Sequence, residues 1–121
     1  MSLLKDFYTV KSCTGNGLYT AEITLNPEHE IFRGHFPGNP VAPGVCMIQM
    51  IKELTENILK RPLFLSSASN VKFMAIINPE ETPDLSLELD LKEEEDGVRV
   101  KNVTRFGETI ALKMSVQFKN N

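Results

Sequence analysis

The chain has 121 residues, of which 41% are hydrophobic and 24% are charged. This length suits one folded domain, residues 1–121, and the net charge of −3 offers no basic surface of the kind that binds nucleic acid. The apolar runs are far shorter than the roughly 20 residues that cross a bilayer, and the first residues lack a signal-peptide pattern, so we expect a cytoplasmic protein.

Residues that commonly bind metals are sparse in this chain. It has two cysteines, Cys13 and Cys46, and two histidines, His29 and His35. The cysteines lie far apart and outside any zinc-ligand spacing, so we expect reduced thiols. Two histidines without neighbouring cysteines would hardly assemble a zinc site, and we predict no metal.

The first predicted element is a β-hairpin. Residues 7–14 and 18–25 are rich in Thr, Val, Ile, Tyr and Phe, and they flank the turn sequence Gly15-Asn16-Gly17. Largely apolar and mainly polar positions alternate along the second arm, which is typical of a strand with one buried face. The next residues, 28–33, carry mixed charge, and we expect His29 among them to be solvated.

A segment dense in glycine and proline, residues 34–45, follows the hairpin. Its prolines fix φ and its glycines allow close backbone approach, so the segment around His35 is stiff and curved. Pro43 stands where a proline of the first helical turn belongs, which directs the amides of Gly44 and Val45 out of a helix N-terminus. Such amides suit an oxygen that gains negative charge. The alternative is a stiff connection with a surface histidine.

Residues 44–60 show the spacing of a helix. Large apolar residues recur there at steps of three and four and cover more than half of the circumference. Such a helix needs apolar partners on several sides, and a two-stranded hairpin cannot supply them. We therefore expect a larger curved sheet from the remaining residues.

Four strands are predicted after the helix. Apolar and polar side chains alternate along residues 70–77, 85–92, 98–105 and 110–119, with a charged turn at 93–97. Two strands, one long helix and four mostly antiparallel strands predict an α+β fold. In this fold a curved antiparallel β-sheet wraps around one long central α-helix.

Residues 34–45, GHFPGNPVAPGV, resemble the active-site signature of the 3-hydroxyacyl-[acyl-carrier-protein] dehydratases of the FabZ and FabA types. Residues 71–79 and 83–91 are similar to the two strands that follow the helix in that family. The resemblance extends from about residue 26 to the end of the chain, and it implies the hot-dog fold.

The resemblance also implies an activity: elimination of water from a 3-hydroxyacyl thioester in fatty-acid or polyketide-type biosynthesis, without a cofactor. His35 would remove the Cα proton, and the Gly44 amide would receive the thioester carbonyl. Phe36, Pro43 and Val45 complete the implied substrate-binding set. In the family two subunits share each active site, and an acidic residue fourteen positions after the histidine, on the helix of the other subunit, protonates the leaving hydroxyl.

This chain departs from the family at the acidic position, which is Gln49. A neutral amide cannot act as a general acid. Glu53 follows four residues later, where the family usually has a glutamine, so the carboxylate and the amide exchange places on one helix face. We expect Glu53 to replace the missing acid in part. The alternative is a solvated glutamate that pairs with Lys52 or Lys60.

The expected partner is an acyl thioester carried on acyl carrier protein or, second, on coenzyme A. We expect a homodimer or an assembly of dimers. Three alternatives remain: a non-catalytic subunit of a heterodimer with a related dehydratase, an acyl-thioester-binding protein, and an acyl thioesterase. An acidic carrier protein requires a local basic patch. The candidate cations are Arg33, Lys60, Arg61, Lys72, Arg99, Lys101 and Arg105.

Overall fold

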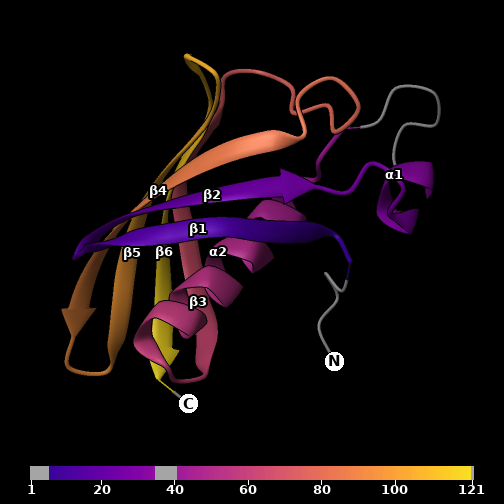
Figure 1. Cartoon of the computed structure of the whole chain (residues 1–121). Helices are drawn as coiled ribbons and strands as arrows, with labels where there is room; N and C mark the ends of the chain where they lie inside the picture. The colour runs from indigo at the N-terminus through magenta and orange to yellow at the C-terminus, as the bar shows by residue number, and fades with distance from the viewer. Residues whose placement is uncertain (1–5, 35–40, 121) are drawn as a thin grey trace.

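The structure, a computed structural model, describes residues 6–34 and 41–120. The predicted site residues His35 and Phe36 lie outside these ranges. Within them six strands form one antiparallel sheet beside one long helix (Figure 1). The strands are β1 (Tyr8–Asn16), β2 (Leu18–Leu25), β3 (Leu63–Phe73), β4 (Asp84–Glu94), β5 (Gly97–Phe106) and β6 (Thr109–Asn120). The helices are α1 (Glu30–Gly34) and α2 (Gly44–Leu59).

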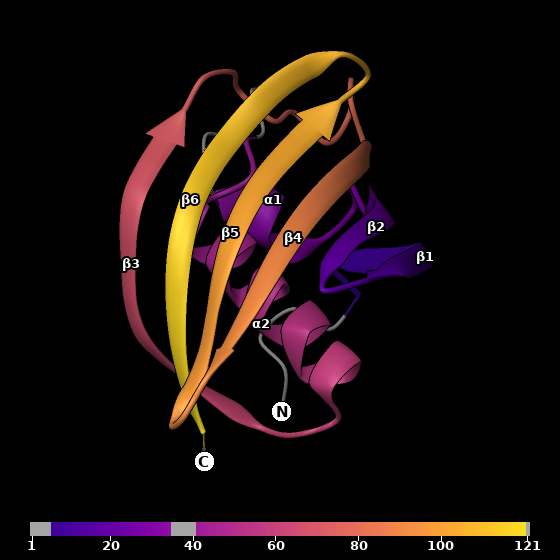
Figure 2. The ribbon, with the colours of Figure 1, turned by 90° about the vertical axis from the view of Figure 1, so that its left-hand side faces the viewer.

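The sheet curves around α2, as Figure 2 shows from a second side. Its strand order is β1-β2-β4-β5-β6-β3, so β1 and β3 are the two edge strands of the described sheet. The inner face of the sheet and the apolar face of α2 share one core. This arrangement confirms the predicted α+β fold with a curved antiparallel sheet around a central helix. No helix among the described residues is long and apolar enough to span a membrane.

Periodicity explains most of the elements. On β4 the alternating leucines Leu85, Leu87 and Leu89 are buried, and their neighbours carry polar side chains outward. On α2 the buried residues are Cys46, Met47, Met50, Ile51, Leu54 and Thr55. The helix ends where predicted, because Lys60 adopts a left-handed conformation (φ 59°) and its N–H donates to the Glu56 carbonyl at 2.8 Å.

The strand predicted at residues 70–77 is wrong in position, because β3 begins at Leu63 and ends at Phe73. This edge strand pairs with β6 alone, and its side chains after Leu63 are exposed, so no inward and outward alternation marks it. Two register shifts, one of them around Asn70 with its φ of 52°, interrupt the pattern further.

The connection at residues 28–33 is also more ordered than predicted, since it contains the short helix α1. His29 is half-buried rather than solvated. Its Nδ1 accepts a hydrogen bond from the Ile31 amide at 3.1 Å, and its ring lies edge-on to Phe7 with centroids 5.3 Å apart. Phe7 in turn stacks on Phe32, with centroids 5.2 Å apart. A side-chain cap and an aromatic cluster therefore hold a segment whose charges suggested a solvated loop.

An ion pair ties the β1–β2 hairpin to β4, and it predicts a pH-dependent stability. Lys11 Nζ lies 2.9 Å and Thr24 Oγ1 lies 2.8 Å from Asp84 Oδ1. The bond from Lys11, followed by the bond from Thr24, lowers the pKa of Asp84. A lowered folded-state pKa stabilises the fold at neutral pH, and this stabilisation is lost as the pH falls through the range in which Asp84 protonates.

We therefore expect Asp84→Asn to lower the melting temperature slightly at neutral pH, and the difference from wild type to vanish in acid. Asp90→Asn, a change at an exposed position of the same strand, serves as the control and should leave the melting temperature unchanged. An Asp84→Asn difference that persists unchanged at low pH would contradict the ion-pair origin.

Candidate active site

Helix α2 presents backbone N–H groups at its start. Pro43 is the N-cap, with φ −67° and ψ 144°, rather than the first helical residue that the sequence predicts. Its carbonyl accepts hydrogen bonds from the amides of Cys46 at 3.1 Å and Met47 at 3.2 Å. The amides of Gly44 and Val45 precede these, where a helix offers no internal acceptor. No acidic side chain lies in the first turn, so the positive end of the helix dipole is uncompensated there.

An apolar hollow of about 370 Å³ adjoins the helix start. It lies between residues 41–42 and residues 73–77. A hydrogen bond of 2.9 Å, from the Ala42 amide to the Ile77 carbonyl, joins these two segments. Phe73 connects it to the helix, because a Cβ atom added to Gly44 would lie 3.1 Å from Phe73 Cζ. Such a lining suits a hydrocarbon chain. The hollow is lined by Val41, Ala42, Phe73, Met74, Ala75, Ile76 and Ile77.

Gln49 and Glu53 form a hydrogen-bonded pair on α2. Gln49 Nε2 donates to Glu53 Oε2 at 3.1 Å, and both side chains are half-buried. Lys52 pairs with Glu56 at 3.4 Å. The structure therefore does not show the alternative in which Glu53 pairs with Lys52. The exchanged amide and carboxylate therefore lie in contact, as their spacing of four residues predicts.

Tyr8, at the start of β1, is the third member of this group. Its hydroxyl donates to Glu53 Oε1 at 2.9 Å. Burial, followed by the hydrogen bond to Glu53 and the charge of that carboxylate, raises the pKa of Tyr8 far above its usual value. The hydroxyl therefore keeps its proton at neutral pH. Tyr8 was not predicted from the sequence, because it lies 45 residues from Glu53 and no local pattern marks such a contact.

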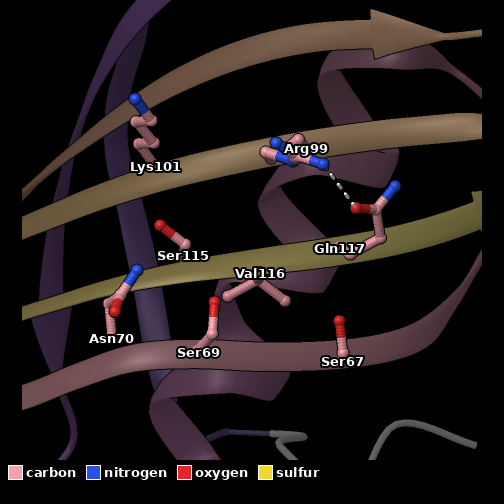
Figure 3. Close-up of a pocket in the computed structure, with 8 residues that line it drawn as sticks. All are labelled: Ser67, Ser69, Asn70, Arg99, Lys101, Ser115, Val116 and Gln117. Atoms are coloured by element: carbon pink, nitrogen blue, oxygen red, sulfur yellow. Dashed lines mark hydrogen bonds between the residues drawn. The ribbon is translucent and has the colours of Figure 1, made fainter.

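A polar hollow of about 360 Å³ lies on the outer face of the sheet, over β3, β5 and β6 (Figure 3). Arg99 in this hollow donates to Gln117 Oε1 at 3.3 Å and pairs with Glu94 at 3.7 Å. The hollow is lined by Ser67, Ser69, Asn70, Arg99, Lys101, Ser115, Val116 and Gln117.

An adjoining hollow brings Lys72 and Lys113 beside Lys101. Lys72 and Lys113 are direct partners in the register of β3 and β6, an arrangement in which like charges repel. Within residues 6–34 and 41–120, these three lysines make no ion pair. Three arginines among the candidate docking cations do make ion pairs. These are Arg61 with Glu93, Arg99 with Glu94 and Arg105 with Glu88.

No group of three His, Cys, Asp or Glu residues is placed to hold a metal ion in the described part of the chain. The arrangement instead provides backbone donors, an apolar hollow and a carboxyl group that accepts hydrogen bonds from Tyr8 and Gln49. Oxygen stabilisation and proton transfer are the chemistry that these groups support.

Comparisons with solved structures agree with the hot-dog fold. A chain of the dehydratase heterocomplex ApeI:P from Xenorhabdus doucetiae superposes with a TM-score of 0.74 at 21% identity, over 93% of this chain and 97% of that chain. A hypothetical thioesterase protein from Streptococcus pneumoniae, solved with coenzyme A, has a TM-score of 0.69 at 8% identity, over 99% of this chain and 91% of that chain. These likenesses concern the fold alone.

Comparisons of sequence identify the family. The 3-hydroxyacyl-[acyl-carrier-protein] dehydratase FabZ of Levilactobacillus brevis is 29% identical over 106 residues, which are 82% of this chain and 70% of that protein. FabZ of Pediococcus pentosaceus is 33% identical over 86 residues, 65% of this chain and 56% of that protein. The family model named ApeI-like, described as ApeI dehydratase, matches residues 11–113. The chain therefore belongs to the ApeI-like dehydratase family.

Proposed function

We propose that this chain is a 3-hydroxyacyl thioester dehydratase, in which Glu53 supplies the proton that the family's missing acid would supply. The hydrogen-bonded group of Tyr8, Gln49 and Glu53 carries this proposal. The names of the FabZ relatives favour acyl carrier protein as the carrier of the substrate. The product is the trans-2-enoyl thioester.

The partners of Glu53 suit a carboxyl group that gains and loses a proton. A tyrosine hydroxyl can donate or accept a hydrogen bond, and a glutamine amide has both a donor and an acceptor atom. Tyr8 and Gln49 can therefore keep their contacts with Glu53 in both of its forms. The carboxylate only accepts hydrogen bonds, whereas the carboxylic acid also donates one. A lysine or arginine partner could not accept the hydrogen bond that the protonated carboxyl group donates, because these side chains only donate.

The spacing along α2 favours an active site shared by two subunits. Gly44 and Glu53 are nine residues apart on this helix, which amounts to about 13.5 Å along its axis. The thioester carbonyl and the 3-hydroxyl of a substrate are separated by only two carbon–carbon bonds. One subunit therefore cannot easily bind the carbonyl at Gly44 and protonate the hydroxyl with its own Glu53. We infer that the proton comes from Glu53 of the partner subunit.

The proposed reaction uses no cofactor. His35, which lies outside the described residues, takes the Cα proton, and the electron pair of that bond forms the Cα–Cβ double bond. The amide of Gly44 stabilises the negative charge that develops on the thioester oxygen. Glu53 passes its proton to the 3-hydroxyl, directly or through a water held by Gln49, and the Cβ–O bond breaks to release water. Solvent then returns a proton to Glu53 and removes one from His35.

A second candidate function is a non-catalytic subunit of a dehydratase heterodimer. The neutral Gln49 at the acidic position favours it, as does the heterocomplex named for the Xenorhabdus doucetiae structure. In that case the contact between Tyr8 and Glu53 would have a structural role, and a related dehydratase chain would supply the acid.

Exchanging the two helix residues tests the proposal. Using a 3-hydroxyacyl carrier-protein substrate, we expect Glu53→Gln to lower kcat by roughly 10²–10⁴-fold, because a general acid contributes about that much. The double exchange Gln49→Glu with Glu53→Gln restores the family arrangement and should recover activity. His35→Ala should abolish turnover without changing the thermal melt.

Glu56→Gln is the matched control on the same helix. Glu56 bonds to Lys52 and to the Leu63 amide, so its loss should affect stability and leave kcat unchanged. Two results would contradict the role of Glu53: full activity in Glu53→Gln, or an inactive wild type that becomes active with Gln49→Glu alone.

The exposed edge strand β3 predicts dimer formation. Phe64, Leu65 and Val71 on this strand are 56%, 49% and 42% exposed, and its outer edge has unpaired backbone groups within the described sheet. We expect β3 to pair with the same kind of strand in a second subunit. The double change Leu65→Lys and Val71→Lys should shift the dimer toward monomer in sedimentation at micromolar concentration.

Leu18→Lys, at an exposed leucine of β2, is the control and should leave the dimer intact. A wild-type protein that sediments only as a monomer, alone and with a related dehydratase chain, would refute both the interface and the shared active site.

The lysines of the outer face predict where an acidic carrier protein docks. Lys72, Lys101 and Lys113 form a local positive patch on a chain whose net charge is −3. Reversing all three to glutamate should weaken carrier-protein binding and flatten its dependence on salt. Lys119→Glu is the control, because Lys119 lies on the same strand as Lys113 but about 20 Å away. Equal affinity of the triple variant and wild type would show that docking occurs elsewhere.

A further inference from the structure

We propose that Tyr8 is a positioning residue for the dehydration, and that its hydroxyl holds the Glu53 carboxyl group in place as that group gains and loses its proton. This inference rests on the proposed function, in which Glu53 is the proton donor. Tyr8 lies outside the signature at residues 34–45, on a strand at the opposite edge of the sheet from β3.

The backbone around Tyr8 is well anchored. Phe7, the residue before it, is fully buried and stacks on Phe32. The Phe7 carbonyl accepts a hydrogen bond from the Asn26 amide at 2.8 Å, and Tyr8 itself pairs with Leu25 in the β1–β2 register. The tyrosine ring therefore projects from a rigid base toward α2, which β1 crosses in Figure 1.

The two hydrogen bonds to Glu53 restrain different atoms. Tyr8 binds Oε1 at 2.9 Å, while Gln49 binds Oε2 at 3.1 Å. Together they set the position and the plane of the carboxyl group, because a rotation of that plane would lengthen both bonds. Removing the Tyr8 hydroxyl takes away one restraint and leaves the bond from Gln49. A catalytic group that is displaced by about 1 Å can lose roughly 100-fold in rate.

The state of the Tyr8 hydroxyl supports this role. Burial and the neighbouring carboxylate raise the pKa of Tyr8, so it stays neutral where the enzyme would work. A neutral hydroxyl donates to Glu53 when that group is ionised and can accept from it when it is protonated. Tyr8 thus keeps the same contact on both sides of a proton transfer.

Tyr8→Phe is the first test, since it removes one oxygen atom and keeps the ring. We expect kcat to fall roughly 10- to 100-fold with KM nearly unchanged, because proton donation acts in the transition state. Tyr19→Phe is the matched control: Tyr19 is the other tyrosine of the chain, half-buried on β2, and its change should leave both constants unaltered. A lowered melting temperature with wild-type kcat would overturn the inference and leave Tyr8 a structural role.

A double-mutant cycle tests whether Tyr8 acts through Glu53. In a Glu53→Gln background, adding Tyr8→Phe should change kcat by less than about twofold, because the group that it positions is already gone. Two losses that multiply would show that Tyr8 acts independently, and the inference would be wrong.

An NMR measurement separates this inference from the proposed function. In a Tyr19→Phe protein labelled at tyrosine ¹³Cζ, the single signal comes from Tyr8. We expect its chemical shift to change in Glu53→Gln, because that substitution replaces the carboxyl group that accepts the Tyr8 hydrogen bond. A signal that is insensitive to Glu53 would overturn the contact and the inference with it. If wild type fails to dehydrate with any partner, the proposed function falls, and the same signal identifies the contact as structural only.

Discussion

The burial of α2 inside the curved sheet is the constraint on which the other features depend. Its apolar face packs Met47, Met50 and Ile51 against the sheet, and each such buried side chain contributes about 1.5–3 kcal/mol. This packing sets the rotation of the helix about its axis. As a result, Gln49 and Glu53 lie at the margin of the buried face, where β1 can reach them.

The two edge strands of the sheet contact different parts of this helix. At the end of β3, Phe73 packs beside Gly44 and the helix start, and at the beginning of β1, Tyr8 binds Glu53. The amides of the helix start and the carboxyl group of Glu53 are therefore held by different parts of one subunit. Two subunits arranged so that one supplies the helix start and the other supplies Glu53 would complete one active site.

Strong periodicity made much of this fold predictable. The buried stripe of α2 and the alternating leucines of β4 correspond to simple patterns of three to four and of two residues. The position of β3 was not predictable in this way, because an exposed edge strand with bulges has no alternating face. The pair of Gln49 and Glu53 follows from helix spacing. Its contact with Tyr8 depends on how β1 lies against α2, and tertiary packing of that kind leaves no local signal.

A crystal structure of the assembled protein with a 3-hydroxyacyl amide analogue, which keeps the carbonyl but has a much less acidic Cα proton, tests the role of Glu53 most directly. We expect the 3-hydroxyl oxygen within hydrogen-bond distance of the Glu53 carboxyl group, or of a water held by Gln49, and the carbonyl oxygen at the Gly44 amide. An analogue whose hydroxyl lies against other groups, with Glu53 turned away, would contradict Glu53 as the proton donor.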